Sequence, residues 1–512
     1  MTATTMKRST KRSHKTVKGQ NLPRLNFTSR SCHNNIRIYQ NWKKLPYSSF
    51  ILPLCFLFLI TSCNNKIESK EEQLPTGIQP WSENPSYWEY QGKPVLLLGA
   101  SDNDNLFQLA HLKSHLDSLA LVGGNYIRNT MSDRDETDEK AFYKNEKGKY
   151  DLEQWNPKYW QRFENLLQLA KERDIIVQIE IWDRFDHARE QWQTDPYNPK
   201  NNVNYTYEQA SLDSLYPDHP GQNKQPFFFT PPILQDNKVL LKYQEAFVEK
   251  LLSISLQYNN VLYCLDNETS GVEEWASYWA TFLRDKSGDT NINMTEMWDH
   301  WDLTSAEHKR TLDHPEKYDF IDISQNSHKI EEENWNNAQY VFAYITERPR
   351  PVNSVKIYGS DAHQPWLSRG ISTKHAVSTF IRNILGGFAS SRFHRPPHGL
   401  GLSNWSIQSI KTMRKIEEKV KLWDLKPMME NLSNREENEA FLSGKSGESY
   451  LLYFPEGGEV KLDLSSYPQQ FELNWISLEE ANWGKSILLD GGDKRSIAPP
   501  VDNGSLALIQ VK

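Results

Sequence analysis

The sequence predicts an α/β fold that consists of a (β/α)8 TIM barrel followed by a small C-terminal all-β sandwich. Two observations carry this prediction. Between residues 95 and 393, short apolar segments alternate with amphipathic helical segments, as in a parallel sheet with crossover helices. Beyond about Asn431 the pattern changes to short alternating strands that are separated by glycine pairs, which is typical of a sandwich.

Eight apolar segments are predicted as barrel strands, which is the number that closes such a barrel. They cover residues 95–100, 125–130, 175–182, 261–265, 292–297, 320–325, 355–359 and 388–393. Amphipathic helices are predicted between them, among others at 159–173, 238–257 and 373–385. We therefore place the barrel at residues 81–430.

The sandwich is predicted at residues 431–512. Its strands are expected at 449–454, 459–464, 471–477, 486–490 and 505–511, with turns at Gly457-Gly458 and Gly491-Gly492.

Residues 1–63 differ in composition from the rest of the chain. Eleven Lys and Arg fall between Lys7 and Lys44, no acidic residue precedes Glu68, and residues 50–60 form an apolar run. The run is too short for a transmembrane helix and suits the core of a signal peptide. Ile60-Thr61-Ser62-Cys63 resembles the lipobox of bacterial lipoproteins, which implies a lipid on Cys63. A tether at residues 64–80 and a place in the outer membrane, at the cell surface or periplasmic face, are then expected.

Charge and cysteine content exclude several function classes. Without the leader, 48 of the 59 basic residues remain against 66 acidic ones, a net charge of −18. Nucleic-acid binding relies on clustered Lys and Arg and is therefore not expected. Only Cys264 lies outside the leader, so neither an internal disulfide nor a cysteine zinc site can form there. We expect no cofactor and no metal.

Aromatic residues are abundant, with 17 Trp and 23 Tyr. A ring face can cover the apolar C–H face of a sugar while its polar edge stays hydrated. The alternative is that a large barrel core needs bulky side chains.

The stretch from Asn259 to Gly271 is the strongest candidate for a catalytic site. Its apolar run ends in Asp266, Asn267 and Glu268, and catalytic groups of such barrels lie at the carboxyl ends of the strands. Asn-Glu at the end of the fourth strand resembles the acid/base signature of the clan A glycoside hydrolases. That resemblance implies that Glu268 protonates the leaving sugar oxygen.

A second carboxyl group is required, because glycosidic hydrolysis needs one acid and one nucleophile or base. The clan pattern places it at the end of strand seven, where this chain has Asp361 in Gly359-Ser360-Asp361-Ala362-His363 instead of the usual Glu. The rival is Glu296. A metal hydrolase that uses Asp361, His363, Asp299 and His300 is a further alternative, although no His-Glu-x-x-His motif is present.

Other side chains at strand ends are expected to line the pocket. Arg128 and Arg392 could pair with a uronic carboxylate or a sulfate, or each could neutralise a neighbouring acid. Asp102 could bind sugar hydroxyls or cap the helix that begins near Leu106. The full predicted lining is Asp102, Arg128, Asn129, Trp182, Asp183, Asn267, Glu296, Trp298, His300, His363, Arg392 and His394.

One loop is unusually long. Residues 186–232 follow strand three, far beyond the usual two to six residues, and are expected to build a substrate cleft or lid. The alternative is a surface loop without a role at the site.

Two further motifs resemble known families. The motif Asn84-Pro-Ser-Tyr-Trp-Glu-Tyr-Gln-Gly-Lys-Pro94, followed by Leu96-Leu-Leu-Gly99, resembles the opening of the barrel in glycoside hydrolase family 140, the apiosidases. Residues 450–458 resemble the collagen-binding-type sandwich that follows the barrel in those hydrolases.

The resemblances imply a hydrolase of a plant or algal polysaccharide or oligosaccharide, with a carbohydrate substrate. The alternative is a non-catalytic glycan-binding lipoprotein on a degenerate barrel, which Asp in place of Glu at strand seven favours.

Overall fold

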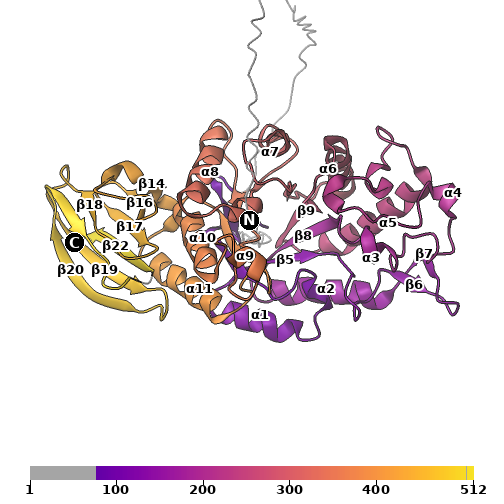
Figure 1. Cartoon of the computed structure of the whole chain (residues 1–512), viewed down its shortest axis with the longest axis horizontal. Coiled ribbons are helices and arrows are strands. Elements are labelled where there is room, and N and C mark those ends of the chain that lie inside the picture. The colour runs from indigo at the N-terminus through magenta and orange to yellow at the C-terminus, as the bar shows by residue number, and fades with distance from the viewer. Residues whose placement is uncertain (1–76, 503) are drawn as a thin grey trace, which may run out of the picture. The chain divides into compact units, whose positions relative to one another are not determined.

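The computed structural model of the chain describes residues 77–502 and 504–512 (Figure 1). The expected signal peptide at residues 1–63, the lipidation of Cys63 and nearly all of the expected tether lie outside the described residues.

The described chain forms a parallel β/α barrel followed by a region of antiparallel strands, which confirms the predicted fold class. Its barrel strands, in chain order, are β4 (Leu97–Ala100), β5 (Tyr126–Thr130), β8 (Ile176–Asp183), β9 (Val261–Asn267), β10 (Met294–Thr295), β11 (Ile321–Asp322), β12 (Val352–Asn353) and β13 (Ser390–Phe393).

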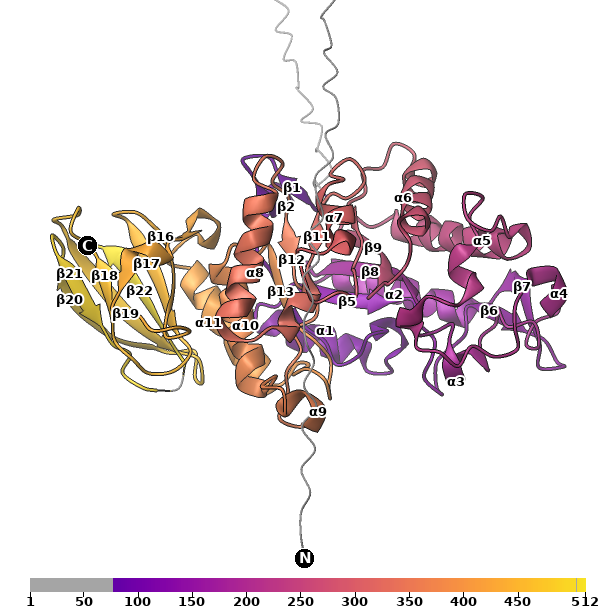
Figure 2. The same cartoon turned by 45° about the horizontal axis from the view of Figure 1, so that its top comes forward.

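Six of these strands form one sheet in the order β10-β9-β8-β5-β4-β13, and β11 pairs with β12. Backbone bonds join the two sheets into a ring, from Asp319 N to Met294 O (2.9 Å) and from Ala389 N to Val352 O (2.8 Å). In Figure 2, β8 and β9 lie to the right of β11, β12 and β13, as this order requires. The carboxyl ends of all eight strands therefore meet at one mouth.

Strand seven differs from the prediction. Pairing with β11 stops at Asn353, whereas backbone bonds to β13 continue through Ser354 to Ile357, which bridges to Phe393. The Ser324 hydroxyl accepts the backbone N–H groups of Val355 (2.9 Å) and Lys356 (3.2 Å). A side chain thus takes the bonds that a neighbouring strand would otherwise make, and the predicted segment 355–359 lies partly beyond the ladder.

Helices cover the outside of the barrel. The helix α2 (Pro157–Lys171) begins at the Asn156 cap with Pro157 in its first turn, and its buried face includes Phe163 and Leu166. The other long helices are α1 (Leu112–Leu121), α5 (Lys238–Ser255), α6 (Glu273–Ser287), α7 (Ala306–Leu312), α8 (Glu331–Tyr344), α10 (Thr373–Leu385) and α11 (Asn404–Glu417).

Short elements extend the barrel at both ends of its strands. One is a three-stranded sheet of β1 (Gln79–Trp81), β2 (Asn84–Tyr90) and β3 (Lys93–Val95), with a turn at Gln91-Gly92 between β2 and β3. A hairpin follows β5, and the long loop after β8 contains two short helices. These elements are β6 (Phe142–Lys144), β7 (Tyr150–Trp155), α3 (Arg189–Trp192) and α4 (Tyr207–Ala210).

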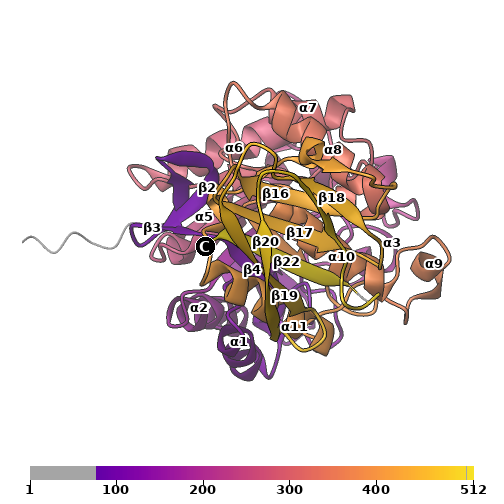
Figure 3. The same cartoon turned by 90° about the vertical axis from the view of Figure 1, so that its left-hand side faces the viewer.

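Two antiparallel sheets form the C-terminal sandwich around a core of their own (Figure 3). The larger has the order β14 (Lys426–Pro427), β16 (Phe441–Lys445), β17 (Ser449–Phe454), β22 (Ser505–Val511), β19 (Gln470–Ser477) and β20 (Trp483–Asp490); the smaller contains β15 (Leu432–Ser433), β18 (Val460–Asp463) and β21 (Lys494–Ile497). Four of these strands, β14, β15, β16 and β21, were not predicted, because they are short or carry few apolar residues.

The barrel and the sandwich meet at α10, which is buried from His375 to its end at Leu385. Phe441 of β16 lies 5.2 Å from the Trp335 ring of α8 and under the guanidinium of Arg382. The Ser378 and Tyr453 hydroxyls are hydrogen-bonded across the same contact at 2.9 Å. A polar, hydrogen-bonded centre with aromatic flanks therefore holds the two parts together.

Within residues 77–502 and 504–512, none of the helices combines the length and the apolar character needed to cross a membrane.

We expect Phe441→Ala to lower the free energy of unfolding by about 3–5 kcal/mol, because it leaves a cavity between α8, α10 and β16. Chemical denaturation followed by fluorescence measures the change. The control is Tyr143→Ala, whose ring is 42% exposed and which should cost little. Equal losses in both variants would contradict the contact described here.

Candidate active site

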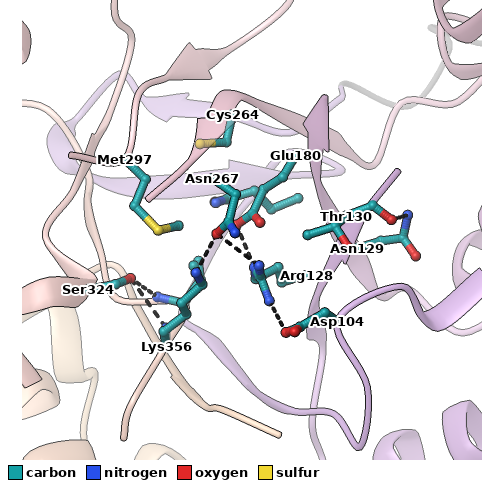
Figure 4. Close-up of polar contacts among 12 residues, drawn as sticks. Asp104, Arg128, Asn129, Thr130, Glu180, Cys264, Asn267, Met297, Ser324 and Lys356 are labelled. Atoms are coloured by element: carbon teal, nitrogen blue, oxygen red, sulfur yellow. Dashed lines mark hydrogen bonds and ion pairs between the residues drawn. The ribbon is translucent and has the colours of Figure 1, made fainter. Parts of the chain in front are cut away.

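Asn267, the last residue of β9, is the centre of a buried polar network in the barrel mouth (Figure 4). Its side-chain oxygen accepts from Arg128 Nη2 at 3.0 Å and from Lys356 Nζ. Its amide nitrogen donates to Asp183 Oδ2 at 2.9 Å. The side-chain amide of Asn267 thereby connects β9 with β5, β8 and the segment after β12.

Arg128 is fully engaged by protein groups. Its Nε donates to Glu180 Oε1 at 2.6 Å, and Nη1 pairs with Asp104. Its side chain is 1% exposed. The sequence alternative, in which this arginine neutralises neighbouring acids, thus describes its environment. Each of its three nitrogens has a protein partner, and its burial keeps the side chain away from a substrate anion.

Arg392 lies equally deep. It donates to Val355 O and to Ser101 Oγ and is completely buried. Burial lowers its pKa to about 10, and the nearby positive charge of Arg128 acts in the same direction. Like Arg128, it belongs to the floor of the site.

Glu268 follows Asn267 and has a left-handed backbone, with φ of +45°. A non-glycine residue in this region carries strain that the surrounding structure must hold, and such strain is common at functional sites. Its Oε1 accepts from Gln325 Nε2 at 2.9 Å, from the Tyr358 hydroxyl, and lies 3.0 Å from Lys356 Nζ.

These partners determine the ionisation of Glu268. Burial by itself would raise its pKa, but the charge of Lys356 and the Tyr358 hydrogen bond outweigh burial and hold the pKa well below the usual value. Glu268 is therefore an ionised carboxylate across the whole physiological pH range.

Asp299 is the second carboxyl group of the mouth. It follows β10, and its backbone N–H donates to Thr269 O at 2.8 Å, one residue beyond Glu268. Burial, and then the negative charge of Glu268, raise the pKa of Asp299 to about 6. Two carboxyl groups at adjacent strand ends are thus held in opposite protonation states near pH 5.

Aromatic rings surround these carboxyl groups. The His328 ring stacks between Trp301, at 4.3 Å, and Tyr358, at 4.7 Å. Arg369 lies over Trp301 at 4.4 Å and over Trp366 at 5.0 Å, which links the loops after β10 and β12. We call Trp301, His328, Tyr358 and Trp366 the aromatic wall.

Two predicted histidines lie beside this wall. The His394 ring is 4.7 Å from that of Tyr358, and the His363 ring is 5.7 Å from that of Trp366. Burial lowers the pKa of His394 well below its ordinary value, so its imidazole is neutral.

Asp361 is not brought to Glu268. Its side chain is exposed, its Oδ1 accepts the Thr373 backbone N–H at 3.0 Å, and it lines a cleft beside the sandwich. Backbone bonding to β13 ends at Ile357, and Ser360 and Asp361 then bond to Ile371 and Thr373 at the start of α10, so residue 361 lies in the following loop rather than beside Glu268.

Glu296, the rival of Asp361, is completely buried. Its Oε1 accepts from the backbone N–H of Asp266 at 3.1 Å and of Met297 at 3.3 Å. Burial and the charge of Asp266 raise its pKa well above the ordinary value. It is a neutral carboxyl group that supports the end of β9 from inside the barrel.

Several other predicted lining residues contact the scaffold. Asn129 accepts from Phe107 N at 3.0 Å, and Asp102 accepts from Leu402 N at 2.7 Å. Trp182 packs among the rings of Phe227, Phe247, Trp275 and Trp279. The Trp298 indole donates a hydrogen bond to the Thr311 hydroxyl. His300 is exposed and accepts a hydrogen bond from the backbone N–H of Asp302. These positions stabilise the loops and the helix layer.

The long loop after β8 packs on itself and on the barrel. His187 stacks on Phe227 at 3.8 Å, and Arg184 bonds to Asp266 at 2.8 Å and lies over Phe228. The loop therefore supports the end of β9 beside the mouth.

In the part of the chain that the structure describes, no three His, Cys, Asp or Glu side chains gather closely enough to hold a metal ion. The alternative set of Asp361, His363, Asp299 and His300 is accordingly not assembled as a ligand cluster.

The sequence reasoning missed four residues that contact Glu268 or its aromatic surroundings: Gln325, His328, Lys356 and Tyr358. Lys356 and Tyr358 both lie within the predicted strand 355–359. A lysine inside a strand expected to be buried was the available signal, because such a charge requires a partner. The partner itself, 88 residues earlier in the chain, is visible only in the fold.

Comparisons with known proteins agree with this architecture. A glycoside hydrolase family 5 protein from Bacteroides vulgatus has a similar structure, with a TM-score of 0.56 and 14% identity over 85% of this chain and 94% of that chain. Another glycoside hydrolase has a TM-score of 0.56 and 11% identity over 86% and 97%. At these identities the likeness shows the fold. No protein-family model matches the sequence, and no curated protein sequence is similar to it.

We expect Lys356→Met to lower the free energy of unfolding by about 3–5 kcal/mol at pH 7, because it leaves Glu268 as an unpaired buried charge. The double variant Lys356→Met/Glu268→Gln should recover a large part of that loss, since no charge then remains. A double-mutant cycle by urea denaturation measures the coupling. Additive losses would contradict the ion pair.

Proposed function

We propose that the protein is a glycoside hydrolase whose two working carboxyl groups are Glu268 and Asp299. The observation that carries the proposal is their placement: both follow adjacent barrel strands, at a mouth surrounded by the aromatic wall. The barrel fold shared with glycoside hydrolases supports the same class of reaction. Because the fold alone does not identify a reaction, the proposal rests mainly on the two carboxyl groups.

The proposed roles reverse the one that the clan A resemblance implies for Glu268. A general acid must carry a proton, and Lys356 keeps Glu268 ionised. Glu268 therefore acts as nucleophile on the anomeric carbon, or as base towards a water molecule. Asp299, with its raised pKa, donates a proton to the leaving oxygen.

Lys356, Tyr358 and Gln325 act as positioning residues in this proposal. All three contact the same oxygen of Glu268, Oε1. Its other oxygen, Oε2, is left to approach the sugar. The anomeric configuration of the first product, observed by NMR, distinguishes the nucleophile from the base role.

The substrate is proposed to be a plant or algal polysaccharide or oligosaccharide. The aromatic wall suits the C–H faces of sugar rings. Because Arg128 and Arg392 are buried and engaged, they supply no site for a uronic carboxylate or a sulfate.

We expect Asp299→Asn to lower kcat/KM about 10²–10⁴-fold on a natural glycan, since the proton donor is lost. An activated aryl glycoside should be much less affected, because its leaving group needs little protonation. Glu268→Gln should abolish turnover of both substrates. Initial rates of sugar and of nitrophenol release measure these effects.

Asp361→Asn is the matched control, an equally small change of an exposed carboxylate outside the mouth. It should retain wild-type turnover of the aryl glycoside. Loss of activity in Asp361→Asn together with full activity in Asp299→Asn would restore the strand-seven assignment and overturn ours.

The protonation states predict an acidic pH optimum. Asp299 must be protonated and its pKa is about 6, so kcat/KM should fall as the pH rises through about 6. Glu268 must be ionised and its pKa is held low, so the acid limb should lie below the usual glutamate value of about 4.3. A profile of kcat/KM that stays flat from pH 5 to 8 would exclude Asp299 as the acid.

A second function has one specific observation in its favour. The segment after β12 presents Lys356 and Tyr358 to Glu268 instead of a carboxylate, as on a barrel that binds glycans without cleaving them. If the wild-type protein binds a glycan tightly and neither hydrolyses it nor releases nitrophenol from any aryl glycoside, this glycan-binding function replaces the enzyme.

A further inference from the structure

A cleft of about 230 Å³ lies between the barrel and the sandwich, outside the mouth described above. Its walls come from the N-terminal parts of α10 and α11 and from the loops that follow β17 and β19. The residues used below are Asp361, Lys374, Trp405, Tyr453, Pro455 and Leu478. None of them contacts Glu268 through a hydrogen bond or ion pair among the described residues.

The cleft has an apolar, rigid floor. Tyr453 and Leu478 are 1% and 3% exposed, and Pro455 is buried. The Tyr453 hydroxyl is held by Ser378 at 2.9 Å, which fixes the floor to α10. A floor of this kind needs no rearrangement to receive a ligand.

Trp405 forms an aromatic side of the cleft. It is 39% exposed, whereas most large aromatic residues of the barrel are buried. It belongs to the first turn of α11, where the Ser403 cap orients the helix. An indole on a fixed helix start can offer its ring to the apolar face of a sugar.

Polar groups stand at the rim of the same cleft. Asp361 is anchored through Oδ1 to the N–H of Thr373, which leaves its second oxygen available as an acceptor. Lys374 pairs with Glu456 of the sandwich. Because the lysine charge is already neutralised by the protein, the cleft favours a hydroxylated, uncharged ligand over an anion.

We propose that this cleft is a second carbohydrate site, which binds one neutral sugar unit of a glycan between Trp405 and Asp361. The volume is below the roughly 300–1,000 Å³ of ordinary small-molecule pockets and suits a single ring. The choice of a sugar rests in part on the proposed function, whereas the site is separate from the catalytic residues. Asp361, predicted from the sequence as catalytic, is here a ligand for sugar hydroxyls.

The test uses the full chain and affinity electrophoresis in gels that contain neutral plant or algal polysaccharides. Because the mouth also binds glycans, each variant is made in the wild type and in a Trp301→Ala background. Trp405→Ala and Asp361→Asn should weaken retention at least tenfold in both backgrounds, and Trp405→Phe should keep most of it. Trp405→Ala, Trp405→Phe and Asp361→Asn should each keep, on a nitrophenyl glycoside, the kcat/KM of the background in which they are made.

The outcomes separate this proposal from the proposed function. Unchanged retention of Trp405→Ala, or no retention of the wild-type protein in any gel, would overturn the second site whatever the hydrolytic activity. Absence of nitrophenyl glycoside turnover with retention that depends on Trp405 would overturn the hydrolase and keep the site. Thermal unfolding midpoints of the variants show whether a loss of retention comes from misfolding. If Trp405→Ala is misfolded, the retention of Trp405→Phe is the deciding measurement: retention close to that of the wild type supports the site, and loss of retention in a folded Trp405→Phe contradicts the expected role of the ring.

Discussion

The mouth of the barrel depends on the ion pair between Lys356 and Glu268. Both groups are withdrawn from water, and a buried charge without its partner costs several kcal/mol. The pair joins the end of β9 to the segment after β12 across the barrel. It also holds Glu268 in a left-handed backbone conformation that an isolated chain would rarely adopt. The chemistry of the site follows from this one contact, because it decides which carboxyl group is ionised.

The remaining charges of the mouth are arranged around the same pair. Arg128 is shared by Asp104, Glu180 and Asn267, and Asn267 in turn contacts Lys356. Since each nitrogen of Arg128 has a protein partner and its side chain is 1% exposed, the network forms a buried floor of the mouth. In the proposed function, contacts to a sugar come from the aromatic wall and from Asp299.

The barrel and the sandwich are coupled through α10. This helix packs on β13 with one face and on β16 and β17 with the other, which explains why it is buried from His375 to Leu385. The cleft that contains Trp405 exists only because the two parts meet in this way. In the proposal of a second site, the sandwich contributes to glycan binding without supplying a catalytic group.

The sequence by itself determined the fold class and most of the elements, because alternation of apolar segments and helical periodicity are local properties. The bounds of α10 and β17 could be read from the chain, whereas β9, predicted at residues 261–265, extends to Asn267. The tertiary structure alone decided the partners. Asp361 lies two residues beyond the predicted strand end in sequence, yet it bonds to the backbone N–H of Thr373 at the start of α10. Which charge neutralises Glu268, and so which carboxyl group keeps its proton, depends on contacts between strands far apart in the chain, and no local pattern encodes them.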